Sequence, residues 1–126
     1  MILKNSISSR DAAISDVAFY ECTSLTSVNI GNGLSSIGAW VFHECSSLAS
    51  VTIPDSVTSI ESLAFSFCTS LTSINIPASV ASIGEYAFQC CESLTIYCEA
   101  QSKPDGWNPN WNPFNYPVVW GYKSKP

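Results

Sequence analysis

The chain has 126 residues, a length typical of one domain, and 46% of them are apolar, which is enough to form a buried core. Only 12% of the residues are charged, and the formal net charge is −5. Nine acidic residues and no Lys or Arg lie between Asp11 and Ser102, so this part of the chain lacks the basic patch that binding to nucleic acid or to an anionic membrane surface requires.

The start of the chain, MILKNSISSR, has only the apolar residues Met1 to Leu3 before Lys4. A secretory leader contains an apolar region of about 7–15 residues, and a membrane-spanning helix needs about 20. We therefore expect no membrane insertion. Three alternatives remain for the compartment: a cytoplasmic protein, a protein whose leader has been removed, or a piece of a longer chain.

Four segments of the chain repeat one pattern at a spacing of 23 residues, beginning at Ile14, Ile37, Ile60 and Ile83. Repeats of about 20–29 residues are typical of leucine-rich-repeat coils, which bury a continuous core only when several units stack. We predict a solenoid over residues 14–98, with three further columns as its inward-facing ladder. These columns are Phe19, Phe42, Phe65 and Phe88; Cys22, Cys45, Cys68 and Cys91; and Leu25, Leu48, Leu71 and Leu94.

Each unit contains one short predicted strand. In the first unit, Val28 and Ile30 alternate with polar residues, which is typical of a half-buried strand. Stacking then gives a parallel β-sheet on one face of the solenoid. The A-F-x-x-C segment on the return side is predicted to form a short helical or 3₁₀ turn. The predicted fold class is therefore α/β.

The pattern I-x-x-x-A-F-x-x-C-x-S-L-x-S-V-x-I-P resembles the BspA-like leucine-rich repeats of bacterial and protist surface proteins, from Ile14 to about Cys98. Val41 and Gly31 depart from it, where Ala and Pro are usual. The resemblance implies a right-handed solenoid with a non-catalytic role in adhesion or protein–protein interaction, and some members bind host matrix proteins. It also implies a cell-surface or secreted location, and no cofactor.

The repeat is lost at both ends. Ile96 and Cys98 flank Tyr97 one residue earlier than the period predicts, and residues 99–126 contain six aromatic residues. This segment resembles the C-terminal caps of the same family, and residues 118–122 are predicted to form one more pairing strand. Residues 1–13 are either a partial coil or the remnant of a truncated upstream repeat, and an open sheet edge there would favour self-association.

The cysteine column is predicted to be structural. A metal site needs paired ligands such as C-x₂-C, whereas six Cys are spread along this chain with a single His. Neighbouring coils lie about 4.8 Å apart, so distance permits disulfides, but stacked side chains run parallel into the core. We predict buried thiols that act as small apolar groups. Cys90 lies beside the column. It could be a reactive thiol, but we favour the interpretation that it is partly covered.

His43 and Glu44 are the other candidate pair. A catalytic site needs a nucleophile, a base and an orienting group that converge, and no Ser lies in a G-x-S-x-G motif. We interpret His43 as a solvated loop residue, and Glu21 with Glu44 as a small acidic stripe. Trp40 and Tyr86 share an apolar column and are interpreted as partly buried. The chain is predicted not to be an enzyme.

The outward side of the sheet is the predicted contact surface for a protein partner, although the same residues also serve to keep the sheet soluble. Its positions are small and polar, and the absence of Trp, Tyr and Arg among them predicts weak or avidity-driven binding. They are Ser27, Asn29, Ser50, Thr52, Ser73 and Asn75.

Two alternative functions remain open. The first is a carbohydrate-binding module that uses the C-terminal aromatic residues with neighbouring amides, although capping of the core explains the same residues. They are Trp107, Trp111, Phe114, Tyr116, Trp120 and Tyr122, with Asn108, Asn110 and Asn112. The second is a structural spacer taken from a longer repeat array.

Overall fold

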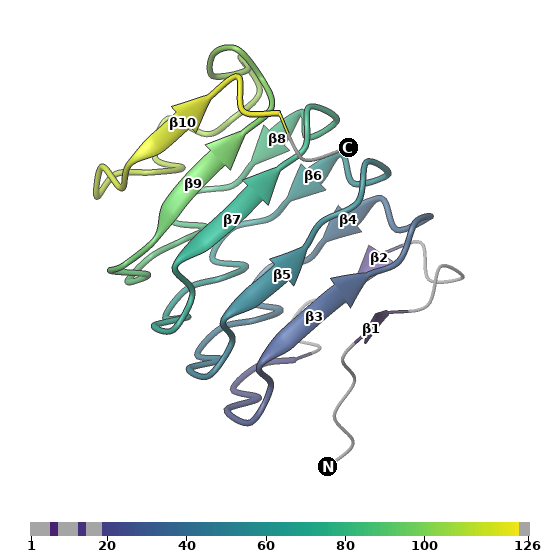
Figure 1. Cartoon of the computed structure of the whole chain (residues 1–126), viewed down its shortest axis with the longest axis vertical. Coiled ribbons are helices and arrows are strands. Elements are labelled where there is room, and N and C mark those ends of the chain that lie inside the picture. Colours follow the sequence, from purple (N-terminus) through teal and green to yellow (C-terminus); the bar gives the residue numbers. More distant parts are fainter. Residues whose placement is uncertain (1–5, 8–12, 15–18, 124–126) are drawn as a thin grey trace.

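The computed structural model describes residues 6–7, 13–14 and 19–123, which wind into stacked coils (Figure 1). Each of the first four coils contributes one strand to a front sheet and one to a second sheet, and the last two strands, β9 and β10, belong to the front sheet only. The front strands are β1 (Ser6–Ile7), β3 (Ser27–Ile30), β5 (Ser50–Thr52), β7 (Ser73–Ile76), β9 (Thr95–Cys98) and β10 (Val118–Trp120). The strands of the second sheet are β2 (Ala13–Ile14), β4 (Ser36–Ile37), β6 (Ser59–Ile60) and β8 (Ser82–Ile83).

All strand pairs are parallel, and their register follows the sequence period. Val28 pairs with Val51 and Ile37 with Ile60, in each case 23 residues apart. From β7 onward, paired residues are one residue closer in the sequence than the period of 23. Ile74, for example, pairs with Ile96. The early position of Ile96 and Cys98 in the sequence is therefore a real shortening of the coil.

The front sheet consists of two ladders. Strands β1, β3 and β5 form one, and β7, β9 and β10 form the other, whereas β2, β4, β6 and β8 form a continuous second sheet. Among the described strands, ladder pairing is thus interrupted between β5 and β7. The adjoining core residues Val51 and Ile53 keep 9% and 8% of their surface exposed, while Ile76 is completely covered.

The return segments contain no helix within the described residues, so the prediction of helical or 3₁₀ turns and of an α/β class was wrong. Two columns of each coil have left-handed backbone, with φ between 56° and 63°. A left-handed residue stops a right-handed helix from continuing. Its N–H instead bonds to the next coil, as Glu44 N does to the Ser66 carbonyl at 2.8 Å. The left-handed residues are Glu21, Glu44, Phe67 and Cys90, and Trp40, Leu63 and Tyr86.

This backbone makes the return side a second set of bonds between coils. Phe42 N donates to the Ala64 carbonyl and Phe65 N to the Ala87 carbonyl, both at 2.8 Å. Buried backbone groups need such partners. Consistent with a structure built of strands and bends, the described part of the chain has no helix with the length and apolar character needed to cross a membrane.

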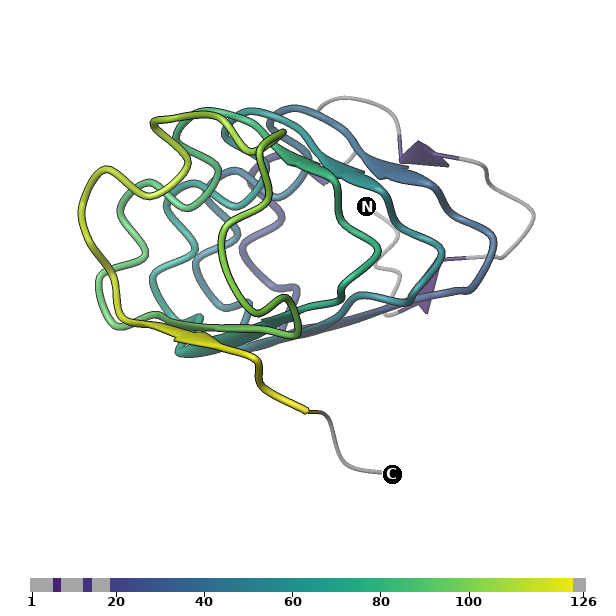
Figure 2. The same ribbon diagram turned by 90° about the horizontal axis from the view of Figure 1, so that it is seen from above.

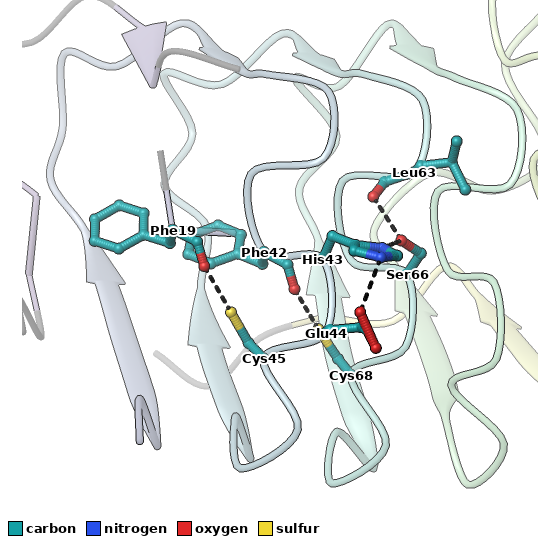
Figure 3. Close-up of polar contacts among 8 residues, drawn as sticks. All are labelled: Phe19, Phe42, His43, Glu44, Cys45, Leu63, Ser66 and Cys68. Atoms are coloured by element: carbon teal, nitrogen blue, oxygen red, sulfur yellow. Dashed lines mark hydrogen bonds and ion pairs between the residues drawn. The ribbon is translucent and has the colours of Figure 1, made fainter. Parts of the chain in front are cut away.

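The core is a series of stacked side chains. The rings of Phe19, Phe42, Phe65 and Phe88 stack in sequence with centroids 5.4, 5.2 and 5.7 Å apart. Figure 3 shows the first two of these rings, Phe19 and Phe42. Coils spaced by one strand separation place identical side chains at this distance, which suits offset aromatic stacking. The four leucines of the ladder, Leu25, Leu48, Leu71 and Leu94, are at most 1% exposed.

The C-terminal segment closes the last coil. Trp107 and Trp111 are 2% and 6% exposed, and their rings meet edge to face with centroids 4.8 Å apart. Trp107 Nε1 donates to the Val80 carbonyl at 3.1 Å. Strand β10 pairs with β9, so the predicted extra strand is present at 118–120 (Figure 2). A solenoid needs such a cover, because the core of its terminal coil would otherwise face water.

The predictions for residues 1–13 lie mostly outside the described residues. Within them, Ile7 pairs with Ile30 and Ala13 with Ser36, so both short strands keep the register of the repeat. The self-association expected at this edge stays a prediction.

Replacing Phe65 by Ala is expected to lower the free energy of unfolding by about 3–5 kcal/mol, because this fully buried ring stacks on two neighbours. Urea unfolding followed by circular dichroism measures this. Phe67→Ala is the matched control, since that ring is 38% exposed and its loss should cost much less. Equal losses in the two variants would contradict the assignment of the phenylalanine stack as the core.

Candidate functional site

The outward side of the front sheet is built by alternation along each strand. In β7, Ile74 and Ile76 point into the core, so Ser73 and Asn75 face solvent. The same alternation exposes Ser50 and Thr52 in β5 and Asn29 in β3, while Ser27 is half-buried. The structure therefore presents the polar residues of the sequence prediction on one face, and their binding role remains a proposal.

One row of this face ends in larger side chains. Asn29 lies beside Thr52, Asn75 beside Tyr97, and Tyr97 beside Val119. Tyr97 is half-buried, and its ring packs at 4.9 Å against that of Tyr122. The expectation of a sheet without Trp, Tyr or Arg was thus wrong. The shortened coil at Ile96 was the signal, because it gives Tyr97 the outward position.

A hollow of about 200 Å³ opens at the ends of β5 and β7, where the ladder is interrupted. Two carboxylates, those of Asp55 and Glu99, stand beside the side chains of Thr52 and Asn75. Glu99 Oε1 accepts a hydrogen bond of 2.9 Å from Ala78 N, which orients this carboxylate. The complete lining is Val51, Thr52, Ile53, Asp55, Asn75, Pro77 and Glu99.

The hollow has the chemistry of a receptor for a polar or cationic side chain. Its carboxylates accept hydrogen bonds, and its apolar floor comes from Val51 and Ile53. Sequence reasoning found Thr52 and Asn75 but missed Asp55 and Glu99. No sequence signal marks those two, because Glu99 lies in the cap segment and comes near Asp55 only through coil stacking.

The cysteine column is held by hydrogen bonds to the core backbone. The thiols of Cys45, Cys68 and Cys91 each donate to a phenylalanine carbonyl of the preceding coil at 3.1 Å. Figure 3 shows the bonds of Cys45 and Cys68. Burial raises the pKa of Cys45 to about 11 and that of Cys98 to about 12. A hydrogen bond with the Cys91 thiol, reinforced by burial, raises the pKa of Cys68. The thiols of Cys45, Cys68 and Cys98 therefore stay protonated and poorly nucleophilic at neutral pH.

The described residues contain no cluster of three or more His, Cys, Asp or Glu side chains arranged to hold a metal ion. The thiols of the column bond to backbone carbonyl oxygens within the core, so a structural role in the core explains why these cysteines repeat.

His43 is buried, so its interpretation as a solvated loop residue was wrong. Only 8% of its surface is exposed, and its Nδ1 lies 2.5 Å from Ser66 Oγ of the next coil. Its Nε2 lies 3.4 Å from Glu44 Oε1 (Figure 3). The left-handed residues Trp40 and Glu44 on either side turn His43 inward, which residue type alone did not reveal.

The trio of Glu44, His43 and Ser66 resembles a hydrolase triad in composition only. Ser66 is completely buried, and its hydroxyl donates to the Leu63 carbonyl at 3.0 Å. A nucleophilic serine must reach a substrate and pass its proton to the histidine. Neither condition is met here, so the trio is a hydrogen-bonded link between two coils.

Two of the aromatic residues proposed for a carbohydrate platform, Trp107 and Trp111, cover the core and are not at the surface, whereas Phe114 is exposed. The neighbouring amides are used by the turn itself. Asn108 Oδ1 accepts from Asn110 N at 2.8 Å, and Asn112 makes two bonds with the Tyr116 backbone. Capping therefore accounts for this segment.

Comparison with known proteins identifies the repeat. Six copies of a family model described as BspA type leucine rich repeat region match residues 5–102. A search of curated protein sequences finds no match.

Three solved structures share the fold. A leucine-rich-repeat protein from T. pallidum is 28% identical with a TM-score of 0.68, over 87% of this chain and 46% of its own. One from Bacteroides ovatus is 30% identical with a TM-score of 0.63, over 86% and 25%. A leucine rich cell surface protein from Faecalibacterium prausnitzii is 37% identical with a TM-score of 0.62, over 75% and 31%. The chain thus spans less than half the length of each.

We expect one cysteine, Cys90, to react with a thiol reagent such as DTNB in the native protein at pH 8, because it alone of the six cysteines is half-buried and the other five are buried. All six should react in urea. The variant Cys90→Ala should lose the fast phase and keep the same unfolding midpoint. Rapid labelling of two or more thiols in the folded chain would contradict the burial of the column.

The raised pKa of Cys45 also predicts alkaline destabilisation. Below the ordinary thiol pKa of 9.0 the buried thiol is neutral in both states, and as the pH rises from there toward about 11 only the unfolded state ionises. Stability is therefore lost over that window. Urea unfolding at pH 8, 9 and 10 measures the free energy of unfolding, which should fall less with rising pH in Cys45→Ala than in the parent chain. Parallel falls in the two proteins would refute this role of Cys45.

Proposed function

Because the chain belongs to the BspA-type leucine-rich-repeat family, we propose that it is a non-catalytic module that binds a protein partner through the outward side of its front sheet. The family and its fold are typically non-catalytic and consistent with protein interaction. The observation that carries the proposal is the row from Asn29 to Val119, which runs past an acidic hollow to an aromatic end.

The physical character of this face favours a protein over a small ligand. Small polar residues on β3, β5 and β7 give a flat surface that a complementary surface can approach closely. Aromatic residues near the centre of such an interface contribute most of the binding energy. Tyr97, supported by Tyr122, supplies that contact here.

The hollow adds specificity to this surface. A partner side chain with hydrogen-bond donors that entered it would meet Asp55, Glu99 and the amide of Asn75. Charged groups of this kind discriminate between partners and speed their encounter more than they raise affinity. One of the similar structures is described as a cell surface protein, which supports an adhesive role for this chain at a surface. For that role we propose a matrix protein as the partner.

Introducing two arginines on the sheet face, Thr52→Arg with Asn75→Arg, is expected to weaken binding to a protein partner at least about tenfold, which is about 1.4 kcal/mol. Their long side chains would fill the hollow and cover the row. Biolayer interferometry against immobilised matrix proteins and a glycan panel, at several chain concentrations, measures this.

The matched control carries the same added charge on the return side, as Ser24→Arg with Ser93→Arg, two exposed positions. It should bind like the parent chain. The variant Tyr97→Ser should also bind weakly. Retained binding in the Thr52 and Asn75 double variant, or saturable binding to glycans alone, would overturn the proposal.

A further inference from the structure

Three exposed aromatic side chains meet on the return side, away from the front sheet. Tyr20, Trp40 and Phe67 keep 43%, 37% and 38% of their surface exposed, and we call them the aromatic patch. All three rings contact the imidazole of His43, with centroid distances of 4.9, 4.8 and 5.5 Å. The three residues lie in the segments that lead from the second sheet to the front sheet, since Trp40 follows β4, Phe67 follows β6 and Tyr20 precedes β3.

The repeat does not require these side chains. Tyr20 shares its column with His43, Ser66 and Gln89, and the column of Phe67 holds Glu21, Glu44 and Cys90. The three aromatic residues therefore come from three different columns and meet only because neighbouring coils stack.

The exposed rings also contribute little to the core. Trp40 and Phe67 have left-handed backbone, which bulky residues adopt at a cost, and they direct their rings outward. The left-handed conformation recurs in the neighbouring coils, and the column of Trp40 also holds Leu63 and Tyr86, so the aromatic residues that depart from their own columns are Tyr20 and Phe67. Large apolar groups gathered on a surface mark interaction sites.

The patch is held in a fixed arrangement. His43 is buried beneath it and bonded to Ser66 Oγ, so the rings rest on a side chain that cannot rotate freely. A binding surface that is already ordered loses little conformational entropy when a partner docks.

Two carboxylates stand beside the patch and determine the charge of its partner. A hollow of about 280 Å³ adjoins Phe67 and is lined by Glu21, Thr23, Glu44, Ser46, Phe67 and Thr69. The imidazole of His43 faces Glu44 at 3.4 Å, and no Lys or Arg occurs from Asp11 to Ser102 to neutralise Glu21. Aromatic faces next to carboxylates attract a cation through both the ring quadrupole and direct charge.

We propose that the aromatic patch and its acidic hollow bind an arginine side chain presented by a segment of a partner protein. The planar guanidinium can stack on an exposed ring while its N–H groups bond to Glu21 or Glu44, a combination that the compact ammonium of lysine cannot match. This surface is separate from the front sheet, so the inference stands independently of the function proposed for that face.

The test uses the full chain and a peptide of alternating glycine and arginine with blocked ends, titrated by NMR. Matched peptides carry lysine, or citrulline as the neutral isostere of arginine. The resonances of the Trp40 indole N–H and the His43 ring report on the patch, and those of Tyr97 report on the front sheet. We expect saturable shifts at Trp40 and His43, at least about threefold tighter binding for arginine than for lysine, and no binding of the citrulline peptide.

Variants then locate the site. Trp40→Leu, which introduces the residue of the next coil at that position, and Glu44→Gln should each weaken arginine binding at least fivefold. Phe114→Ala and Asp105→Asn, which alter an exposed aromatic residue and an exposed acid of the C-terminal segment, should leave it unchanged. Thermal unfolding confirms that each variant is folded.

Three outcomes would overturn the proposal. The first is equal binding of the arginine and citrulline peptides, and the second is unchanged binding in Trp40→Leu and Glu44→Gln. The third is shifts confined to Tyr97 and lost in the Thr52→Arg, Asn75→Arg variant, which would place the cation in the front-sheet hollow instead. Failure of front-sheet binding to matrix proteins leaves these expectations unaffected, so the two proposals fail separately.

Discussion

Hydrogen bonding between successive coils is the constraint on which the rest of the structure depends. Each buried N–H of one coil needs a carbonyl in the next, and a coil of nearly constant length brings the two together. On the front sheet the bonds follow β geometry, whereas on the return side they require left-handed residues such as Glu44 and Phe67. Once every coil has the same backbone path, like side chains must stack. The phenylalanine rings and the thiols directed at phenylalanine carbonyls are consequences of that stacking.

The repeated columns were sufficient to predict the solenoid, its register and its core from the sequence. A column that is apolar in every unit, such as that of Leu48, must face the core, because only there are its side chains removed from water. The return side was predicted wrongly because a period of 23 shows which residues lie together and not which φ they adopt. Glycine or asparagine usually marks left-handed backbone, but the residues here are Glu, Trp, Leu and Phe. Only the demand for bonds between coils explains them.

The candidate sites also contain some residues that the sequence could predict and others that it could not. Alternation along a strand placed Thr52 and Asn75 on the outward side, since a pleated strand permits one choice. The acidic hollow beside them depends on an interrupted ladder between β5 and β7, a feature of three-dimensional packing that no local pattern records. His43 was misjudged for a related reason. A polar residue in a bend is usually solvated, but here the partner that makes burial favourable, Ser66, belongs to the following coil.

In a repeat protein, departures from the repeat are the informative positions for function. Columns that face the core cannot vary without leaving a cavity or a strained coil, so their residues report on stability. Outward columns vary at little cost, and polar residues there need no further explanation. A large aromatic side chain in an outward column is different, because it exposes apolar surface to water without strengthening the stack. Tyr97 on the front sheet and Tyr20 with Phe67 on the return side are such departures, and a hollow that contains two carboxylates lies near each place. Two chemically similar surfaces on different sides of one short solenoid would allow it to hold two basic segments at once, which joins partners more tightly than either contact alone.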